Sequence, residues 1–479
     1  MNIIEIVSDT LRYDAVAYHG VDPVGWDILQ RPQTPHIDRF AASAMVFDRA
    51  YTGSFPTIPM RTDMITGRYT FPFRGWTPLP DDEITLAERL GEAGYVSMLI
   101  CDTPHLIRDG HRFDRGFSAW HWTRGQEGDR AITDDVFVPE PCDPDKQRMP
   151  ERHMDCHAKW RASGPTPCIG APRPILLWRK PCPTPAAGWS ASSGPTPHTH
   201  ERFYLHIDAF DPHEPWDPPQ HYVDLYDPGY QGQVVDHPRY DYVERFLTPE
   251  ELRHCRALYA GEVTLVDRWL GHLFETIERL GLYENTAVLF MSDHGHYIGD
   301  HGRVGKSGDG PDGPWPFYRE VNQMVAIRSP MARVPGGVSG GRTAFLTQPV
   351  DILPTILDLT GVALPEGLHG ISLKPLLYGQ ELAPAREVAV TSPGLTDDPA
   401  SPVCSTITDG RWALQYRGPD YPAELHDLDQ DPAQTRNVYA EERGEAERLH
   451  LAYLELLHRA GAAPERVALR DRLPDGDLC

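Results

Sequence analysis

Four short apolar runs are spaced along the chain and are bounded by turn residues. They cover residues 3–7, 96–101, 203–207 and 287–291. Runs of this length between turn residues are typical of buried β-strands. The sequence therefore predicts four core strands.

Two of the segments between these runs have the spacing of amphipathic helices. Residues 84–93 place Leu86, Leu90 and Ala93 on one helical face. Residues 249–280 carry a longer apolar stripe, formed by Leu258, Leu265, Trp269, Leu273 and Ile277. A glycine follows each segment, as it commonly follows the last turn of a helix. Because strands that alternate with helices indicate βαβ units, we expect an α/β fold with a mainly parallel sheet between two helical layers.

The pattern changes after about residue 375. There, residues 387–391 and 411–416 are predicted strands, and residues 440–460 form an amphipathic helix. We therefore expect a catalytic domain over residues 1–375 and a small C-terminal α+β subdomain over residues 376–479. Within the first domain, residues 140–200 are rich in Pro, Cys, Trp and Arg and show neither the helical nor the strand period of apolar residues, which predicts an irregular insertion.

The charge of the chain excludes some partners. The 45 basic and 69 acidic residues leave a net charge of −24, so nucleic acids and anionic membrane surfaces are poor partners. No apolar run is long enough to cross a bilayer, and the first residues read as a strand rather than as a signal peptide. We therefore expect a soluble, cytoplasmic protein.

Eight cysteines are scattered along the chain without a CxxC pair. Four of them fall between residues 142 and 182. Reduced free thiols are the expectation for a cytoplasmic protein, and a zinc or disulfide cluster within this segment is the alternative.

Polar residues with catalytic chemistry follow three of the predicted strands. Asp9 follows the first strand, Asp208 and His213 follow the third, and Asp293 and His294 follow the fourth. In open α/β sheets, ligands bind at the carboxyl ends of the strands. The sequence therefore predicts one site at this edge of the sheet.

A further motif carries the strongest chemical signal. Thr57-Ile58-Pro59-Met60-Arg61 precedes Thr66-Gly67-Arg68. With the strand-end residues, it resembles the sulfatase branch of the alkaline phosphatase superfamily. The resemblance extends in order through residues 8–14, 259–263, 292–295, 299–302, 305–306, 348–355 and 424–428. It implies an alkaline phosphatase-like fold and a metal-dependent hydrolase.

One position of this motif departs from the sulfatase pattern. Thr57 stands where that family has a Cys or Ser that is oxidised to formylglycine. Oxidation of threonine would give a ketone, because its Cβ carries a methyl group. An unmodified Thr57 can still attack as an alkoxide when a divalent metal lowers the pKa of its hydroxyl. Water must then cleave the ester at the central atom, which is routine for phosphorus and difficult for sulfur.

The predicted metal site contains mostly oxygen ligands. The resemblance assigns one divalent metal to Asp9, Asp293 and His294, with the Thr57 oxygen as a further ligand. Carboxylate-rich sites suit Mg, Ca or Mn, and the imidazole also admits Zn. Thr10 stands where many members of the family have a second carboxylate, and phosphonate monoester hydrolases share this difference.

The resemblance also assigns the residues that contact substrate. Arg61 would stabilise the nucleophile and an oxygen of the transferred group, while His213 and Lys306 would bind that group or protonate the leaving oxygen. Thr10, Thr103 and His105 are further substrate-binding candidates. Thr103-Pro104-His105 replaces the Lys-x-His of many sulfatases, and the loss of that lysine favours a substrate with less negative charge.

Three hypotheses follow for a small anionic ester substrate. The first is a hydrolase of phosphodiesters or phosphonate monoesters with Thr57 as its direct nucleophile. The second is a sulfuric ester hydrolase resembling arylsulfatases, and the third is an anion-binding pseudoenzyme. The sequence leaves a homo-oligomer possible.

Overall fold

The computed structural model describes residues 1–124, 142–148, 202–324, 331–333, 335–338, 340–398 and 401–474. Most of the predicted insertion at 140–200 lies outside these residues, as do Cys156, Cys168, Cys182 and Cys479. The four described cysteines, Cys101, Cys142, Cys255 and Cys404, are buried free thiols.

A six-stranded sheet in the order β12-β7-β1-β5-β3-β4 forms the centre of the fold. Its strands are β12 (Met331–Arg333), β7 (Thr286–Ser292), β1 (Asn2–Ser8), β5 (Phe203–Ala209), β3 (Val96–Cys101) and β4 (Ala119–Trp122). All pairs are parallel except β12 with β7. The predicted parallel α/β fold is confirmed, and the four predicted strands are the four central ones.

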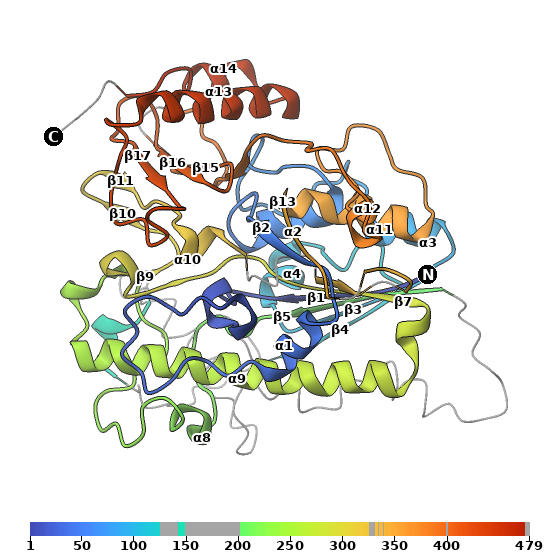
Figure 1. Ribbon diagram of the computed structural model, residues 1–479, viewed down its shortest axis with the longest axis horizontal. Coiled ribbons are helices and arrows are strands. Elements are labelled where there is room, and N and C mark those ends of the chain that lie inside the picture. Colours follow the sequence, from blue (N-terminus) through green and yellow to red (C-terminus); the bar gives the residue numbers. More distant parts are fainter. Residues whose placement is uncertain are drawn as a thin grey trace.

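Helices cover both faces of this sheet (Figure 1). α9 (Pro249–Arg279) runs along one face, with α1 (Pro35–Ala41) and α8 (Gln220–Val223) beside it. The other face is covered by α2 (Thr57–Thr66), α3 (Leu86–Glu92), α11 (Ile352–Thr360) and α12 (Lys374–Leu377). Two further short helices are α4 (Pro104–Ile107) and α10 (Arg319–Asn322).

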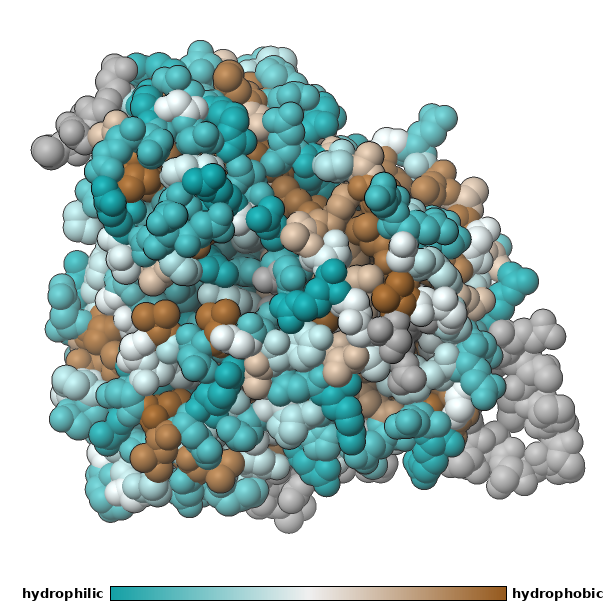
Figure 2. All heavy atoms as spheres, viewed as in Figure 1, coloured by the Kyte–Doolittle hydropathy of each residue, from teal (hydrophilic) through white to brown (hydrophobic). Residues whose placement is uncertain are grey.

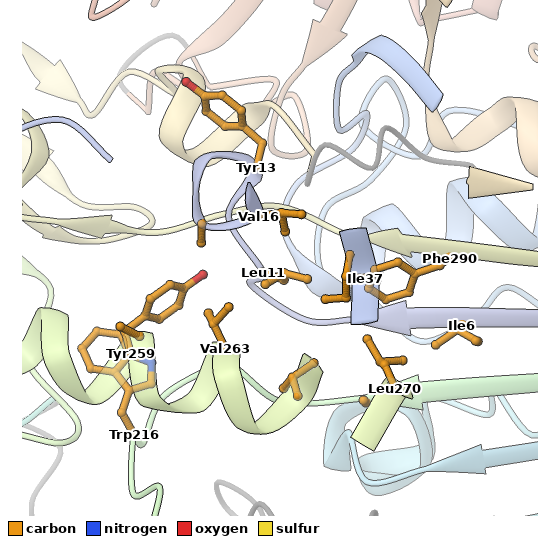
Figure 3. Packing of buried hydrophobic residues seen from close by; sticks show 14 of the residues in the cluster. Ile6, Leu11, Tyr13, Val16, Ile37, Trp216, Tyr259, Val263, Leu270 and Phe290 are labelled. Atoms are coloured by element: carbon orange, nitrogen blue, oxygen red, sulfur yellow. The ribbon is translucent and has the colours of Figure 1, made fainter. Parts of the chain in front are cut away.

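Alternating residues of β1 contribute to the two cores. Ile4 and Ile6 pack in the cluster that contains Leu258 and Ile277 of the predicted α9 stripe, whereas Ile3 and Val7 pack with residues of α2, α3 and α11. Leu265 and Trp269 of that stripe lie outside this cluster. This follows from the period of two in a strand, which sends successive side chains to opposite faces. Figure 3 shows Val263 and Leu270 extending from α9 toward the sheet.

The long helix α9 begins and ends where its sequence predicts. Thr248 caps its first turn, and Glu251 completes the capping box by accepting a hydrogen bond from the Thr248 N–H. Gly281 follows its end in a left-handed conformation. The 31-residue helix therefore spans the whole length of the sheet.

The described residues form three further small sheets in addition to the central one. β2 (Val46–Ala50) pairs in parallel with β13 (Arg342–Thr347), and β10 (Asp309–Gly310) pairs with β11 (Gly313–Pro314). β6 (Asp241–Tyr242), β9 (Arg303–Gly305) and β8 (Tyr297–Ile298) form the third. None of these short strands was predicted from the pattern.

The C-terminal part forms a separate antiparallel sheet. Its strands are β14 (Ala389–Thr391), β15 (Ser405–Thr408), β16 (Trp412–Tyr416) and β17 (Glu424–Asp427), and α13 (Arg443–Ala460) and α14 (Pro464–Ala468) complete the subdomain. The two predicted strands and the predicted helix correspond to β14, β16 and α13. The C-terminal α+β subdomain is thus confirmed, while the boundary at residue 375 stays a prediction.

The face of the molecule shown in Figure 2 is mainly polar. Figure 2 shows hydrophilic residues over most of the visible face, with hydrophobic residues in separate groups. Among the described residues, no helix combines the length and the apolar character needed to cross a membrane.

Candidate active site

The sheet itself brings the first acidic residues together. Asp9 comes directly after β1, and Asp293 comes directly after β7. These strands are neighbours in register, since Ser8 pairs with Ser292. The carboxyl edge of the sheet therefore places the two aspartates side by side, as the sequence predicts.

Asp9, Asp293 and His294 form a compact group of possible metal ligands. One ligand atom from each lies within 4.8 Å of the others, and all three side chains are buried. Asp9 Oδ2 accepts no hydrogen bond from the described residues. This buried oxygen has an ion-pair contact with Arg61 Nη2 at 3.2 Å but no hydrogen bond, so it remains available to a metal cation.

His294 presents one nitrogen to this group. Its Nδ1 lies 3.1 Å from the carbonyl oxygen of Gly295, which accepts the ring proton and leaves the Nε2 lone pair available. Burial, with Lys306 nearby, lowers the pKa of His294 to about 3, so the imidazole is neutral. The donor set therefore fits Mg, Ca or Mn, and its imidazole admits Zn.

The two aspartates differ in their electrostatic surroundings. Burial and the charge of Asp293 raise the pKa of Asp9 well above its usual range. Burial also opposes ionisation of Asp293, but His294 and Arg61 hold its pKa below the usual range. A divalent cation between them would offset the repulsion of the two carboxylates.

Thr57 is the first residue of α2 and faces the same group. Its Oγ1 lies 3.5 Å from His294 Nε2, and the residue is buried. Asp63, in the next turns of α2, accepts hydrogen bonds from the N–H and the hydroxyl of Ser54 and from the N–H of Thr70. These bonds fix the loop that leads into Thr57, so the nucleophile candidate sits on a rigid support.

Arg61 lies one turn after Thr57 and contacts the carboxylates rather than open space. Its Nη1 donates to Asp293 Oδ2 at 2.7 Å and to the Thr57 carbonyl at 3.3 Å. Its Nη2 lies 3.2 Å from Asp9 Oδ2. The other edge of the guanidinium donates to Asp208, from Nε at 2.7 Å and from Nη2 at 2.9 Å.

His213 and Lys306 form a second part of the site. Lys306 Nζ lies 2.8 Å from His213 Nε2, and both residues are buried. Lys306 follows β9 and Gly305, whose φ of 118° favours glycine. A Cβ at Gly305 would lie 2.5 Å from the ring of Tyr240, so only glycine lets this turn deliver the lysine.

The three substrate-binding candidates have different surroundings. Thr10 has a φ of 61° and donates its hydroxyl to Asp9 and its N–H to Asp293, so it orients both carboxylates. Thr103 Oγ1 donates to Asp208 at 2.6 Å. The His105 ring lies 6.1 Å from that of Phe210, which stacks on His213 at 4.1 Å.

Two functional candidates were not assigned from the sequence. Asp208 was placed at the correct edge of the sheet, but its pairing with Arg61 depends on tertiary structure. Glu214 Oε2 lies 3.3 Å from His213 Nδ1, and Glu214 Oε1 lies 3.0 Å from Arg148 Nη1. Burial by itself would raise the pKa of Glu214, but the cations nearby hold it well below its usual range. The sequence signal that could have identified Glu214 is its position directly after the candidate His213.

Comparison with known families decides the class of the protein. The family model "Sulfatase" matches residues 1–362, which is most of the chain. The chain belongs to the sulfatase family. A second model, "N-sulphoglucosamine sulphohydrolase, C-terminal", matches residues 321–457. This sulfatase-family chain is accordingly a hydrolase that acts on ester bonds.

Relatives of this sulfatase-family chain include named sulfatases and a broader enzyme. An ulvan-active sulfatase of Formosa agariphila is 27% identical over 81% of this chain and 67% of its own length. The "multifunctional alkaline phosphatase superfamily protein PehA" of Trinickia caryophylli is 24% identical over 78% of this chain and 77% of its own. The fold is similar to the phosphonate monoester hydrolase SpPMH of Silicibacter pomeroyi, with a TM-score of 0.67, 22% identity and coverage of 98% and 97%.

Proposed function

We propose that the chain is a metal-dependent hydrolase of phosphodiesters or phosphonate monoesters, with Thr57 as its direct nucleophile. One observation carries this proposal. The Thr57 hydroxyl lies 3.5 Å from His294 Nε2, within the Asp9–Asp293–His294 group, and its Cβ methyl excludes oxidation to an aldehyde. A metal held there would lower the pKa of the hydroxyl and offset charge on the transferred group.

The chain's own residues account for the remaining steps. Thr57 loses its hydroxyl proton to solvent as Oγ1 forms a bond to phosphorus, and the bond from phosphorus to the leaving oxygen breaks. The Lys306–His213 pair supplies a proton to that oxygen. Water then attacks phosphorus and the bond from phosphorus to Thr57 Oγ1 breaks, while the two protons of the water return to Thr57 Oγ1 and to the Lys306–His213 pair. The positive end of α2 favours negative charge on Thr57 during attack, because Thr57 is its first residue.

Sulfuric ester hydrolysis is the second candidate function. It is supported by the family itself, and the ulvan-active sulfatase named above is one of the relatives. In that case Thr57 would have to transfer sulfate without formylglycine. A small anionic ester is the substrate in both cases, while a cytoplasmic location and a homo-oligomer stay predictions.

A panel of four aryl esters separates these candidates. Purified protein is assayed with bis-p-nitrophenyl phosphate, p-nitrophenyl phenylphosphonate, p-nitrophenyl phosphate and p-nitrophenyl sulfate. We expect the diester or the phosphonate to be the best substrate. If the sulfate is turned over more than about tenfold faster, a difference of about 1.4 kcal/mol in barrier, sulfatase is the right description. If none of the four esters is turned over with any of the candidate metals, the remaining hypothesis is the anion-binding pseudoenzyme.

A further inference from the structure

Asp208 is the penultimate residue of strand β5 and receives four hydrogen-bond contacts from side chains beside the site. It is buried and accepts hydrogen bonds from Arg61 Nε and Nη2 and from Thr103 Oγ1, the last at 2.6 Å. It also lies 3.4 Å from His206 Nε2. Four side-chain contacts to one carboxylate fix its position and its charge. Burial opposes that charge, but Arg61 lowers the pKa of Asp208 below its usual range.

Arg61 is held from two opposite sides. Asp208 binds its Nε and Nη2 as a bidentate pair, while Nη1 bonds to Asp293 and Nη2 faces Asp9 at 3.2 Å. Each nitrogen of the guanidinium therefore already contacts a protein oxygen. The planar fork of arginine permits this arrangement, which a lysine could not reproduce.

A second buried pair supports Asp208 from within the sheet. His206 precedes Asp208 on the same face of β5, and its Nδ1 lies 2.9 Å from Glu5 Oε2 on β1. Glu5 also accepts a hydrogen bond from the Tyr204 hydroxyl at 2.6 Å. Because Glu5 and His206 are register partners in adjacent strands, this support is part of the sheet rather than of a loop.

We propose that Asp208 is a positioning residue that fixes Arg61 as a brace between the two metal-site aspartates and keeps its charge away from the substrate. The brace orients Asp9 and Asp293. The charge of Asp208 offsets that of Arg61, which leaves Lys306 as the cation facing the transferred group and restricts the site to singly charged esters. The restriction on substrates rests on the proposed phosphoryl-transfer function; the brace does not.

The brace is tested by metal binding without catalysis. Mn²⁺ affinity is measured by calorimetry for the wild type and for Asp208→Asn, which keeps the shape of the side chain. We expect about tenfold weaker binding, because Arg61 loses its anchor and adds an unbalanced charge beside the ligands. Thr103→Val removes one bond to Asp208 and should weaken Mn²⁺ binding in the same direction. This second variant decides the question if Asp208→Asn does not fold.

Substrate charge is tested with the same variants. The ratio of kcat/KM for doubly charged p-nitrophenyl phosphate to that for singly charged bis-p-nitrophenyl phosphate should rise about tenfold in Asp208→Asn, because Arg61 gains donors for an extra oxygen. A purely structural role would lower both values equally. If wild-type protein cleaves neither ester, the proposed function fails and Mn²⁺ affinity alone judges the brace.

Asp351→Asn is the matched control. Asp351 and Arg386 form another buried bidentate pair, at the start of α11, and neither of them shares a hydrogen bond with Asp208 or Arg61. Its loss should lower the unfolding temperature but leave Mn²⁺ affinity and the substrate ratio unchanged. An unchanged Mn²⁺ affinity or, in an active protein, an unchanged ratio in the Asp208 variant overturns the proposal.

Discussion

Lys306 Nζ lies 2.8 Å from His213 Nε2, although 93 residues separate the two in the chain. His213 Nδ1 lies 2.6 Å from the Glu214 carbonyl oxygen, so Nδ1 carries the ring proton and Nε2 accepts from the ammonium group. The two side chains thus share one proton that can be passed to a leaving group. The Glu214 carboxylate lies 3.3 Å from Nδ1, on the side of the imidazole ring opposite Lys306, and holds the ring in this orientation.

Removing either member of this pair should slow substrates with poor leaving groups most. We expect His213→Ala and Lys306→Ala to lower kcat by about 10²–10⁴-fold for an alkyl ester and by much less for p-nitrophenyl esters, whose leaving group needs no proton. The measurement is kcat over a series of substituted phenyl esters. Lys374→Ala, at a partly exposed lysine on α12, is the control and should leave the series unchanged. Equal loss for all leaving groups would contradict proton donation.

Substitutions at Thr57 test the nucleophile directly. Thr57→Ala should lower turnover by about 10³-fold or more, while Mn²⁺ still binds through Asp9, Asp293 and His294. Thr57→Ser retains the hydroxyl and should keep phosphoryl transfer. Thr57→Cys, produced in cells that make formylglycine, should gain sulfate-ester hydrolysis. Mass spectrometry of the wild-type peptide should show an unmodified threonine, and a modified residue there would refute direct attack.

Metal removal should abolish turnover. Chelation leaves the Asp9 and Asp293 carboxylates in mutual repulsion and the Thr57 hydroxyl at its ordinary pKa. Turnover is measured after dialysis against a chelator and again after Mg, Ca, Mn or Zn is added singly. Asp293→Ala should not recover with any of them. Full activity of that variant in the presence of chelator would show that no metal takes part.

The buried pair of Glu5 and His206 predicts a loss of stability at high pH. Burial alone would lower the pKa of His206, but Glu5 and Asp208 raise it from 6.5 to about 9. The protonated imidazole therefore stabilises the fold fully below pH 6.5, and this contribution is lost as the pH rises to about 9. Urea unfolding at several pH values should show this decline, and His206→Gln should flatten it. A wild-type curve with the same slope as that of His206→Gln would mean that the pair does not titrate in this range.

Regular elements were predictable where the pattern is repeated and uninterrupted. The four central strands are apolar runs bounded on both sides by turn residues, and α9 carries apolar residues at helical spacing over 31 residues, so the pattern identifies them. The pairing of β2 with β13 was not predictable, since it joins segments that are about 300 residues apart and each is only five or six residues long.

Sequence by itself determined the members of the group of possible metal ligands. Asp9, Asp293 and His294 follow strands, and parallel strands end at one edge, so their convergence follows from chain direction. It also determined what Thr57 can become, because the methyl group on its Cβ is a property of the residue alone.

Only the tertiary structure decided how these groups are held and balanced. Arg61 is four residues from Thr57, yet its guanidinium bonds to Asp208 and Asp293, which lie on two different strands. Thr10 takes a φ of 61° because bonds to Asp9 and Asp293 hold it there. Such contacts join atoms whose distance depends on the whole packed fold, and no spacing along the chain encodes them.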